Sequence, residues 1–162
     1  MSGAVKVSGL YRYPVQSVQG EELSTMAFGP KGVPGDRAFS IADLERNVVA
    51  HVSAARKNYR AMFNWQARFV SEPAVDADLP VIEIDFADGT TMRSDDAGID
   101  KAISDRLEID AALVRNNGSR IPMLFESSPC HLLTTATLKR LQQEHETGVF
   151  VPSRFRPHIF LD

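Results

Sequence analysis

The chain has 162 residues, a formal net charge of −3 at pH 7, and hydrophobic and charged shares of 43% and 24%. This length suits one domain, or one domain with a fragment of a second, and allows a buried hydrophobic core. The slight negative charge disfavours nucleic acid or an anionic membrane as a general partner.

The sequence shows no feature of secretion or of membrane insertion. Residues 1–13 alternate polar and apolar side chains and lack the apolar centre of a signal peptide. No apolar run approaches the ~18 residues that a membrane-spanning helix needs. Cys130 is the only cysteine, which excludes an internal disulfide. We therefore expect a soluble, cytoplasmic protein.

The first part of the chain predicts short strands joined by turns. Residues 5–15 alternate in polarity, which predicts a strand with one apolar face. Residues 23–28 predict a second short strand, and residues 29–35, rich in glycine and proline, a rigid turn. Residues 38–42 and 47–52 flank a short polar turn and predict a β-hairpin.

The clearest strand pattern covers residues 61–70, where Phe63 and Trp65 share one face with further apolar side chains. Such alternation predicts a strand with one buried side. Residues 82–86 repeat the pattern, and an Asp-Gly turn leads from them into residues 90–93. This arrangement predicts a second hairpin.

Two helices are expected between and after these strands. Residues 99–107 place apolar side chains at helical spacing, which predicts an amphipathic helix. A second helix follows residue 134, with Leu138 and Leu141 facing inward. Short polar residues before each helix can serve as N-caps. The candidate caps are Asp95, Asp96, Thr134 and Thr135.

Strands are expected again at residues 130–134 and 155–161, on either side of the second helix. The polar segment 116–122 is the best candidate for a loop and a boundary. We predict a mainly β, α+β chain with two short helices. Residues 1–115 would form a β-barrel, and residues 116–162 would begin a second unit packed against it.

The glycine-rich turn does not match a nucleotide-binding motif. Gly29, Gly32 and Gly35 form G-x-x-G-x-x-G, whereas a dinucleotide fingerprint needs G-x-G-x-x-G between a strand and a helix. Here the glycines precede a strand, so a structural turn is the preferred interpretation. No G-x-S-x-G elbow is present, and no pair of carboxylates stands out, so no catalytic residue is predicted.

The histidines and the cysteine do not predict a metal site. No two histidines have the i, i+4 spacing of a zinc protease, and no Cys-x-x-Cys is present. Cys130 and His131 are neighbours in an expected strand, so their side chains should point to opposite faces. A packed cysteine is the default interpretation. The four histidines are His51, His131, His145 and His158.

Thirteen arginines stand beside five lysines, and several lie at turns or strand starts. The planar guanidinium group can grip phosphate oxygens through two hydrogen bonds. Exposed ion pairs are the alternative, and for any single arginine they are the simpler explanation.

Four segments occur in an order that a known family shares. They read Leu-Tyr-Arg-Tyr-Pro-Val-Gln-Ser (10–17), Gly-Asp-Arg-Ala-Phe-Ser-Ile-Ala-Asp (35–43), Pro-Cys-His-Leu-Leu-Thr-Thr-Ala-Thr-Leu (129–138) and Arg-Phe-Arg-Pro-His-Ile-Phe-Leu-Asp (154–162). Together they resemble the MOSC (molybdenum cofactor sulfurase C-terminal) N-terminal β-barrel family running into the MOSC domain. Relatives include the mitochondrial amidoxime-reducing component. The resemblance implies a MOSC-like β-barrel in a short form that lacks most of the MOSC domain.

The resemblance also implies a site for the pterin phosphate of the molybdenum cofactor, or molybdopterin. In the family, a Tyr-Pro-Val-Lys-Ser turn, a Gly-Asp-Arg turn and an Arg-Phe-Arg-Pro-Asn segment supply groups that hold this phosphate. Ser17, Arg37 and Arg156 match these positions. Turns at the mouth of a barrel can present a hydroxyl and guanidinium groups together.

The chain departs from the family pattern at two positions of this site. Gln16 replaces the usual lysine, and His158 replaces the usual asparagine. Losing one charged hydrogen bond should weaken phosphate binding roughly ten- to a hundredfold. Residues 53–57 resemble a further family segment, so Arg56 and Lys57 would add charge at the same mouth.

The family's metal-binding cysteine lies downstream of the Arg-Pro-Asn segment, and Cys130 does not match it. We therefore expect a domain that binds or delivers the cofactor and is not catalytic by itself. A second hypothesis is a vestigial interaction module that forms a homodimer or binds a protein partner through unpaired sheet edges. A third is the N-terminal part of a molybdenum-dependent oxidoreductase that acts on N-hydroxylated or S-oxidised substrates.

Overall fold

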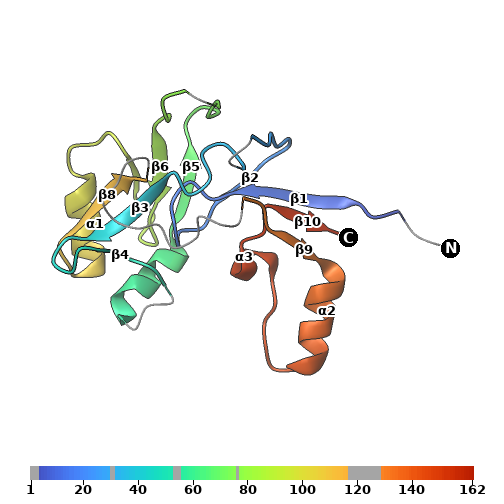
Figure 1. The fold of residues 1–162 in the computed structure, drawn as a ribbon. Helices are drawn as coiled ribbons and strands as arrows, with labels where there is room; N and C mark the ends of the chain where they lie inside the picture. The colour runs from blue at the N-terminus through green and yellow to red at the C-terminus, as the bar shows by residue number, and fades with distance from the viewer. Residues whose placement is uncertain (1–3, 30–31, 53–55, 76, 117–128) are drawn as a thin grey trace.

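The computed structural model describes residues 4–29, 32–52, 56–75, 77–116 and 129–162. Within these ranges the chain forms three sheets and four helices (Figure 1). The strands are β1 (Val7–Arg12), β2 (Glu21–Glu22), β3 (Phe39–Asp43), β4 (Val48–Val49), β5 (Gln66–Phe69), β6 (Ile82–Asp85), β7 (Thr91–Arg93), β8 (Ala111–Arg115), β9 (Leu132–Thr134) and β10 (Ile159–Leu161). The helices are the 3-10 helix η1 (Lys57–Asn64), α1 (Ile99–Leu107), α2 (Thr135–Glu144) and α3 (Pro152–Phe155).

The segment that follows β1 joins two antiparallel sheets, β4-β3-β8 and β5-β6-β7. The Gln16 N–H group donates to the carbonyl of Phe39 at 2.9 Å, and the Gln19 N–H group donates to the carbonyl of Trp65 at 3.0 Å. Because one segment bonds to both sheets, residues 13–20 are held between them. This closure fixes the turn that carries the first predicted site residues.

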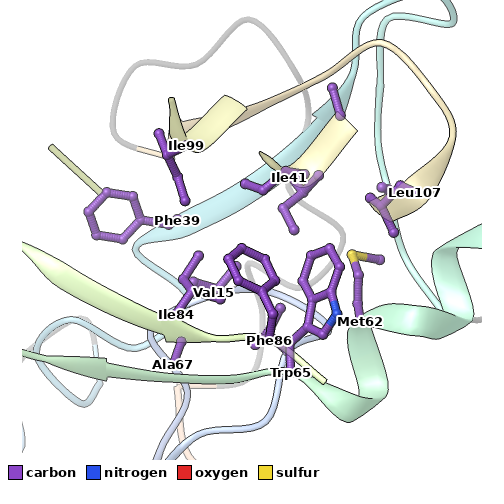
Figure 2. Packing of buried hydrophobic residues seen from close by; sticks show 14 of the residues in the cluster. Val15, Phe39, Ile41, Met62, Trp65, Ala67, Ile84, Phe86, Ile99 and Leu107 are labelled. Carbon is purple, nitrogen blue, oxygen red and sulfur yellow. The ribbon is translucent and has the colours of Figure 1, made fainter. Parts of the chain in front are cut away.

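The hydrophobic core fills the space between these two sheets (Figure 2). Ile41 of β3 is fully buried, and alternate residues of β6 point inward, as the sequence pattern predicts. The Trp65 and Phe86 rings meet edge to face, with their centroids 4.8 Å apart. Met62 of η1 and Leu107 of α1 close one end of the cluster. Two helices therefore complete a core that the strands begin.

The predicted strand over residues 61–70 is wrong in its first half. Helix η1 occupies that part, and strand β5 starts only at Gln66. The helix turns Tyr59 and Met62 into the core and leaves the Phe63 side chain facing outward, 39% exposed. Tertiary packing of the helix overrides the two-residue alternation here.

Two other strand predictions need correction. Residues 23–28 do not form a strand, since β2 comprises only Glu21–Glu22 and pairs with the end of β1. Strand β1 begins at Val7, and both Val5 and Val7 are exposed. The register of β1 shifts between Val7 and Gly9 where it pairs with β10, so the alternation does not continue through this point.

Both predicted hairpins are confirmed, as the antiparallel pairs β3–β4 and β6–β7. The first predicted helix is confirmed as α1, but its N-cap is Gly98, and neither predicted aspartate caps it. Asp96 instead accepts a hydrogen bond from the N–H group of Arg93 at 2.8 Å. Its side chain therefore stabilises the turn before the helix.

The second predicted helix is confirmed as α2. The Thr134 hydroxyl caps it by accepting a hydrogen bond from the N–H group of Thr137 at 3.1 Å. Leu138 and Leu141 are only half-buried, and α2 buries no side chain fully. Helices η1 and α3 were not predicted. None of the helices in the described ranges is long and apolar enough to cross a membrane.

The C-terminal segment is hydrogen-bonded to the N-terminal strand. Strand β10 pairs antiparallel with β1 and parallel with β9, in a sheet of order β2-β1-β10-β9. Lys6 and Asp162 exchange two backbone hydrogen bonds, of 3.0 and 2.8 Å. Figure 1 shows α2 and α3 below this sheet, with β3 and β8 to its left.

The predicted strands at both sides of α2 are shorter than expected. Strand β9 starts at Leu132, and α3 occupies the beginning of the segment expected to form the second strand. The proposed boundary loop, residues 116–122, lies outside the described residues apart from Asn116. That residue hydrogen-bonds to the carbonyl of Ala38 at 2.8 Å, next to β3.

Trp65→Ala should lower the free energy of unfolding by about 3–5 kcal/mol, because it leaves a void beside Phe86. Phe63→Ala should lower it by less than about 1 kcal/mol, because the Phe63 side chain lies outside the core. Urea denaturation followed by circular dichroism measures both values. Equal losses would show that Phe63 shares the buried face and that the strand extends through it.

Candidate functional site

Four of the six predicted site residues line one open cavity of about 440 Å³, which we name the arginine cavity. It lies where the turn after β1, the turn before β3, the start of β9 and α3 meet. Arg37, Arg154 and Arg156 line it, and no carboxylate does so within the described part of the chain. The other lining residues are Gln16, Ser17, His51, Val52, Phe63, Cys130, His131 and Phe155.

Three residues of this cavity adopt a left-handed backbone conformation. The φ angles are 65° at Ser17, 49° at Arg37 and 52° at Arg156. Such a conformation in a residue other than glycine costs about 1–3 kcal/mol and is concentrated at functional sites. In the described ranges only Asn47, in a hairpin turn, and Glu108, which ends α1, share it. The matched sequence motifs therefore fold into the unusual turns that aim their side chains.

Arg156 is a partly buried cation with no carboxylate bonded to it in the described structure. Its guanidinium donates to the carbonyls of Val15, at 3.3 Å, and Val18. It also stacks over the Tyr13 ring, 4.3 Å from the ring centroid. Burial and the nearby charge of Arg37 lower the pKa of Arg156 to about 10. A bound anion would relieve both effects.

The Tyr13 ring packs against the guanidinium group of Arg156. Burial raises the pKa of its hydroxyl to about 12, although the neighbouring arginines act in the opposite direction. The hydroxyl therefore stays protonated and donates to the buried carbonyl of Pro157 at 3.1 Å. This bond ties the turn after β1 to the residue that follows Arg156.

The Asp36 carboxylate gathers three donors from separate parts of the chain. Its Oδ1 accepts from the N–H group of Tyr13 at 3.0 Å. Its Oδ2 accepts from the Arg37 guanidinium and lies 3.0 Å from His158 Nε2. Burial alone would raise the pKa of Asp36, but the His158 hydrogen bond and the Arg37 charge outweigh it and lower that pKa.

His158 is fully buried, and its hydrogen bonds identify its tautomer. The N–H group of His131 donates to His158 Nδ1 at 2.9 Å, so this nitrogen carries no proton. The Nε2 atom must then carry the proton and donate it to Asp36. His158 therefore joins the residue before β9 to the turn before β3.

Gln16 has an unsatisfied donor at the edge of the cavity. Its side-chain oxygen accepts from the Ser40 hydroxyl at 3.3 Å. Its Nε2 atom is buried and makes no hydrogen bond within the described structure. A buried donor without a partner is destabilising by about 1–3 kcal/mol, so an acceptor in the cavity would stabilise it.

Arg56 and Lys57 do not line the arginine cavity. Arg56 forms an ion pair with the buried Asp43 carboxylate at 2.8 Å, and Tyr59 donates to the same group at 2.6 Å. Lys57 is exposed at the start of η1. Residues 53–55 of this family-like segment lie outside the described residues. Arg56 thus has a structural partner that the sequence pattern did not reveal.

Sequence reasoning missed several residues of this region. Asp36 belongs to the Gly-Asp-Arg motif, and its position next to Arg37 was the one sign in the sequence that it could lie at the site. Cys130 and His131 both line the cavity, although alternation suggested opposite faces. Burial and the charge of Asp36 raise the pKa of the Cys130 thiol, which favours its protonated form. In the described ranges no three His, Cys, Asp or Glu side chains form a group that could hold a metal ion.

Residues 4–72 match the family model of the MOSC N-terminal beta barrel domain. The matched segment contains Gln16, Ser17 and Arg37 of the cavity, whereas Arg156 lies beyond it. No curated protein and no solved structure matches the chain. The match confirms the family resemblance for this segment, and the motifs at residues 129–138 and 154–162 lie outside it.

Asp36→Asn should make stability less dependent on pH. The pKa of Asp36 is lowered in the folded state, so its charge stabilises the fold above the ordinary carboxyl pKa of about 3.9. That contribution is lost as the pH falls through the folded-state pKa. The variant should therefore be less stable than the wild type at pH 7 and approach it near pH 2.

Urea titrations at both pH values measure this difference. Asp105→Asn is the control, because its ion pair with Lys101 is exposed and exposed pairs contribute little. A deficit of Asp36→Asn that stays constant from pH 7 to pH 2 would contradict the assignment.

Proposed function

We propose, for a chain whose residues 4–72 belong to the MOSC N-terminal β-barrel domain family, that the arginine cavity binds the phosphate end of a molybdenum-cofactor-type pterin. The role we propose is binding or delivery of the cofactor, without independent catalysis. The observation that carries the proposal is Arg156, a partly buried cation that faces the cavity with no carboxylate partner in the described structure.

The charge around Arg156 favours an anion over a neutral ligand. Arg37 and Arg154 line the same space, and among the described residues only Arg37 has a carboxylate partner, Asp36. The guanidinium of Arg154 instead donates to the carbonyl of Val149 at 2.7 Å. A phosphate group can accept several of these N–H donors at once, and charged hydrogen bonds of this kind are the strong ones.

The remaining polar groups also fit a phosphate. The unsatisfied Gln16 Nε2 is a donor in need of an acceptor oxygen. The Ser17 hydroxyl accepts only a long bond, 3.4 Å, from the N–H group of Val52, so it remains able to donate. Without the family's lysine, the charge of the site rests on arginines. We therefore expect binding weaker than in relatives that keep the lysine.

The donor set fits the phosphate end of the cofactor better than its metal. The cofactor would supply redox chemistry at molybdenum when bound, and its pterin phosphate would meet Arg37, Arg156, Ser17 and Gln16. Cys130 lines the same cavity, but the raised pKa of its thiol disfavours the thiolate that ligates metals. We assign no metal ligand and derive no reaction step.

Arg156→Ala should weaken the binding of inorganic phosphate about ten- to a hundredfold, the equivalent of one or two charged hydrogen bonds. Arg156→Lys keeps the positive charge but loses the planar guanidinium group, so its phosphate affinity should lie between those of the wild type and Arg156→Ala. Isothermal titration calorimetry at fixed ionic strength measures the constants. Arg140→Ala removes an exposed arginine paired with Glu144 and should bind like the wild type.

The same variants extend the test to the cofactor. Wild-type protein purified from cells that make the cofactor should retain pterin, detected by fluorescence after oxidation, and Arg156→Ala should lose it. Equal phosphate affinity and equal pterin content in all variants would contradict the proposal.

A protein-interaction module is the second candidate, favoured by the exposed edge of the C-terminal sheet. Strand β9 is the last strand of its sheet, with Leu132 56% exposed. Helix α2, which follows it, buries no side chain fully. An edge that has no partner strand among the described residues, next to a helix with no fully buried side chain, invites pairing with another chain. We propose that this chain is a second copy of the same protein.

Leu132→Lys should shift a dimer of this kind toward monomer, because charge on an edge strand opposes pairing. Analytical ultracentrifugation over a concentration series measures the effect. Leu44→Lys, at an exposed leucine outside this edge, is the matched control and should leave the dimer intact. A wild-type protein that sediments as a monomer at every concentration would contradict the second candidate.

A further inference from the structure

A second open hollow, of about 580 Å³, is lined by residues of β1, β2, η1 and α3. We name it the Glu22 hollow, because Glu22 is the one charged residue in its described lining. The arginine cavity is lined instead by three arginines and, within the described part of the chain, by no carboxylate. The two spaces therefore suit groups of opposite charge.

Tyr11 and Glu22 lie next to each other at this hollow. They are directly opposite in the antiparallel pair of β1 and β2, so their side chains share one face of the sheet. Burial and the negative charge of Glu22 raise the pKa of the Tyr11 hydroxyl. The Tyr11 ring packs against Gly9, where a β-carbon would lie 2.6 Å from the tyrosine oxygen. An aromatic ring is thus held beside a carboxylate.

The Glu22 carboxylate has no cation bonded to it. Within the described ranges it forms no ion pair and no hydrogen bond, whereas the preceding Glu21 accepts from Arg12 at 2.8 Å. A solvated glutamate is common on protein surfaces, so the missing partner alone indicates no site. The aromatic residues around this carboxylate supply the second observation.

The hollow contains aromatic rings that no cation covers. Tyr13, one of its lining residues, already has the guanidinium of Arg156 over its ring, 4.3 Å from the centroid. No arginine of the described structure lies over Tyr11 or Phe63, which line the same hollow. The Phe63 side chain is 39% exposed. Aromatic faces attract cations, most of all the planar guanidinium group.

Two further lining residues offer acceptors for N–H groups. Gln66 donates from Nε2 to the carbonyl of Gly20 at 3.1 Å, which leaves its Oε1 able to accept. The Ser153 hydroxyl makes no hydrogen bond to any described residue. A quaternary ammonium group has no N–H to donate, whereas a guanidinium group has five donors and can pair with a carboxylate through two of them.

We infer that the Glu22 hollow binds a guanidinium group, which pairs with the Glu22 carboxylate and stacks on Tyr11 or Phe63. The inference goes beyond the proposed function and does not depend on it, because it requires no ligand in the arginine cavity. The group can belong to a free guanidine compound or to an arginine side chain of a partner protein. Both sources share the same planar cation, and the experiment distinguishes them.

Two probes of nearly the same shape, Nα-acetyl-arginine amide and Nα-acetyl-citrulline amide, test the inference. The first carries the guanidinium charge and the second a neutral urea group. In nuclear magnetic resonance titrations of the labelled protein, the arginine probe should shift the amide signals of Tyr11 and Glu22 to saturation. The citrulline probe should bind at least about fivefold more weakly, because it lacks the charge that meets Glu22 and the aromatic rings.

Glu22→Gln should weaken the arginine probe about fivefold and leave the citrulline probe unchanged within about twofold. Tyr11→Leu should weaken the arginine probe about threefold, because it removes the aromatic face and keeps an apolar side chain. Glu45→Gln is the matched control, since Glu45 is exposed and lines neither space, and it should bind like the wild type. Thermal unfolding shows that each variant retains its fold.

Equal affinity for the two probes would overturn the inference, and so would an unchanged affinity of Glu22→Gln for the arginine probe. If both variants weaken binding as expected, the peptide acetyl-Gly-Gly-Arg-Gly-Gly-amide identifies the source. Tighter binding of the peptide than of the single residue supports an arginine side chain of a partner protein. Equal binding of the two supports a free guanidine compound.

Discussion

The buried carboxylate of Asp36 is the contact on which the cavity depends. It accepts hydrogen bonds from the backbone N–H group of Tyr13, the guanidinium of Arg37 and the imidazole of His158. These three residues belong to distant stretches of the chain. A buried charge is tolerated only where its partners satisfy it, so these stretches must meet at one place. Of the cavity arginines, Arg37 is held directly by this carboxylate.

The sequence predicts those elements whose signals are local. Helix α1 and the hairpins β3–β4 and β6–β7 follow from helical spacing and from tight turns between apolar runs. Residues 61–65 illustrate the limit, because Phe63 and Trp65 look alike in an alternating pattern. Only the packing of Tyr59 and Met62 against the core decides that one aromatic side chain is buried and the other is not.

At the site, too, residues within short motifs could be recognised from the sequence, whereas contacts between distant residues could not. The motifs around Ser17, Arg37 and Arg156 could be recognised from the sequence because these short segments resemble those of a known family. The ion pair between Arg56 and Asp43 could not be predicted from the sequence. The two residues are thirteen positions apart, and nothing in the sequence distinguishes Asp43 from the other carboxylates as the partner. Geometry therefore reduces the predicted cations to Arg37 and Arg156, because these two line the arginine cavity and Arg56 and Lys57 do not.

The pairing of β1 with β10 has a consequence for how the protein is made. Arg156 reaches the carbonyl of Val15 across 141 positions of sequence, and His158 approaches Asp36 from the same last stretch. Contacts of such long range form late and slowly, because a large loop must close first. During translation, strands β3 to β8 are synthesised long before the C-terminal residues that line the arginine cavity. A nascent chain therefore lacks the groups that complete the arginine cavity until residues 154–158 have been synthesised.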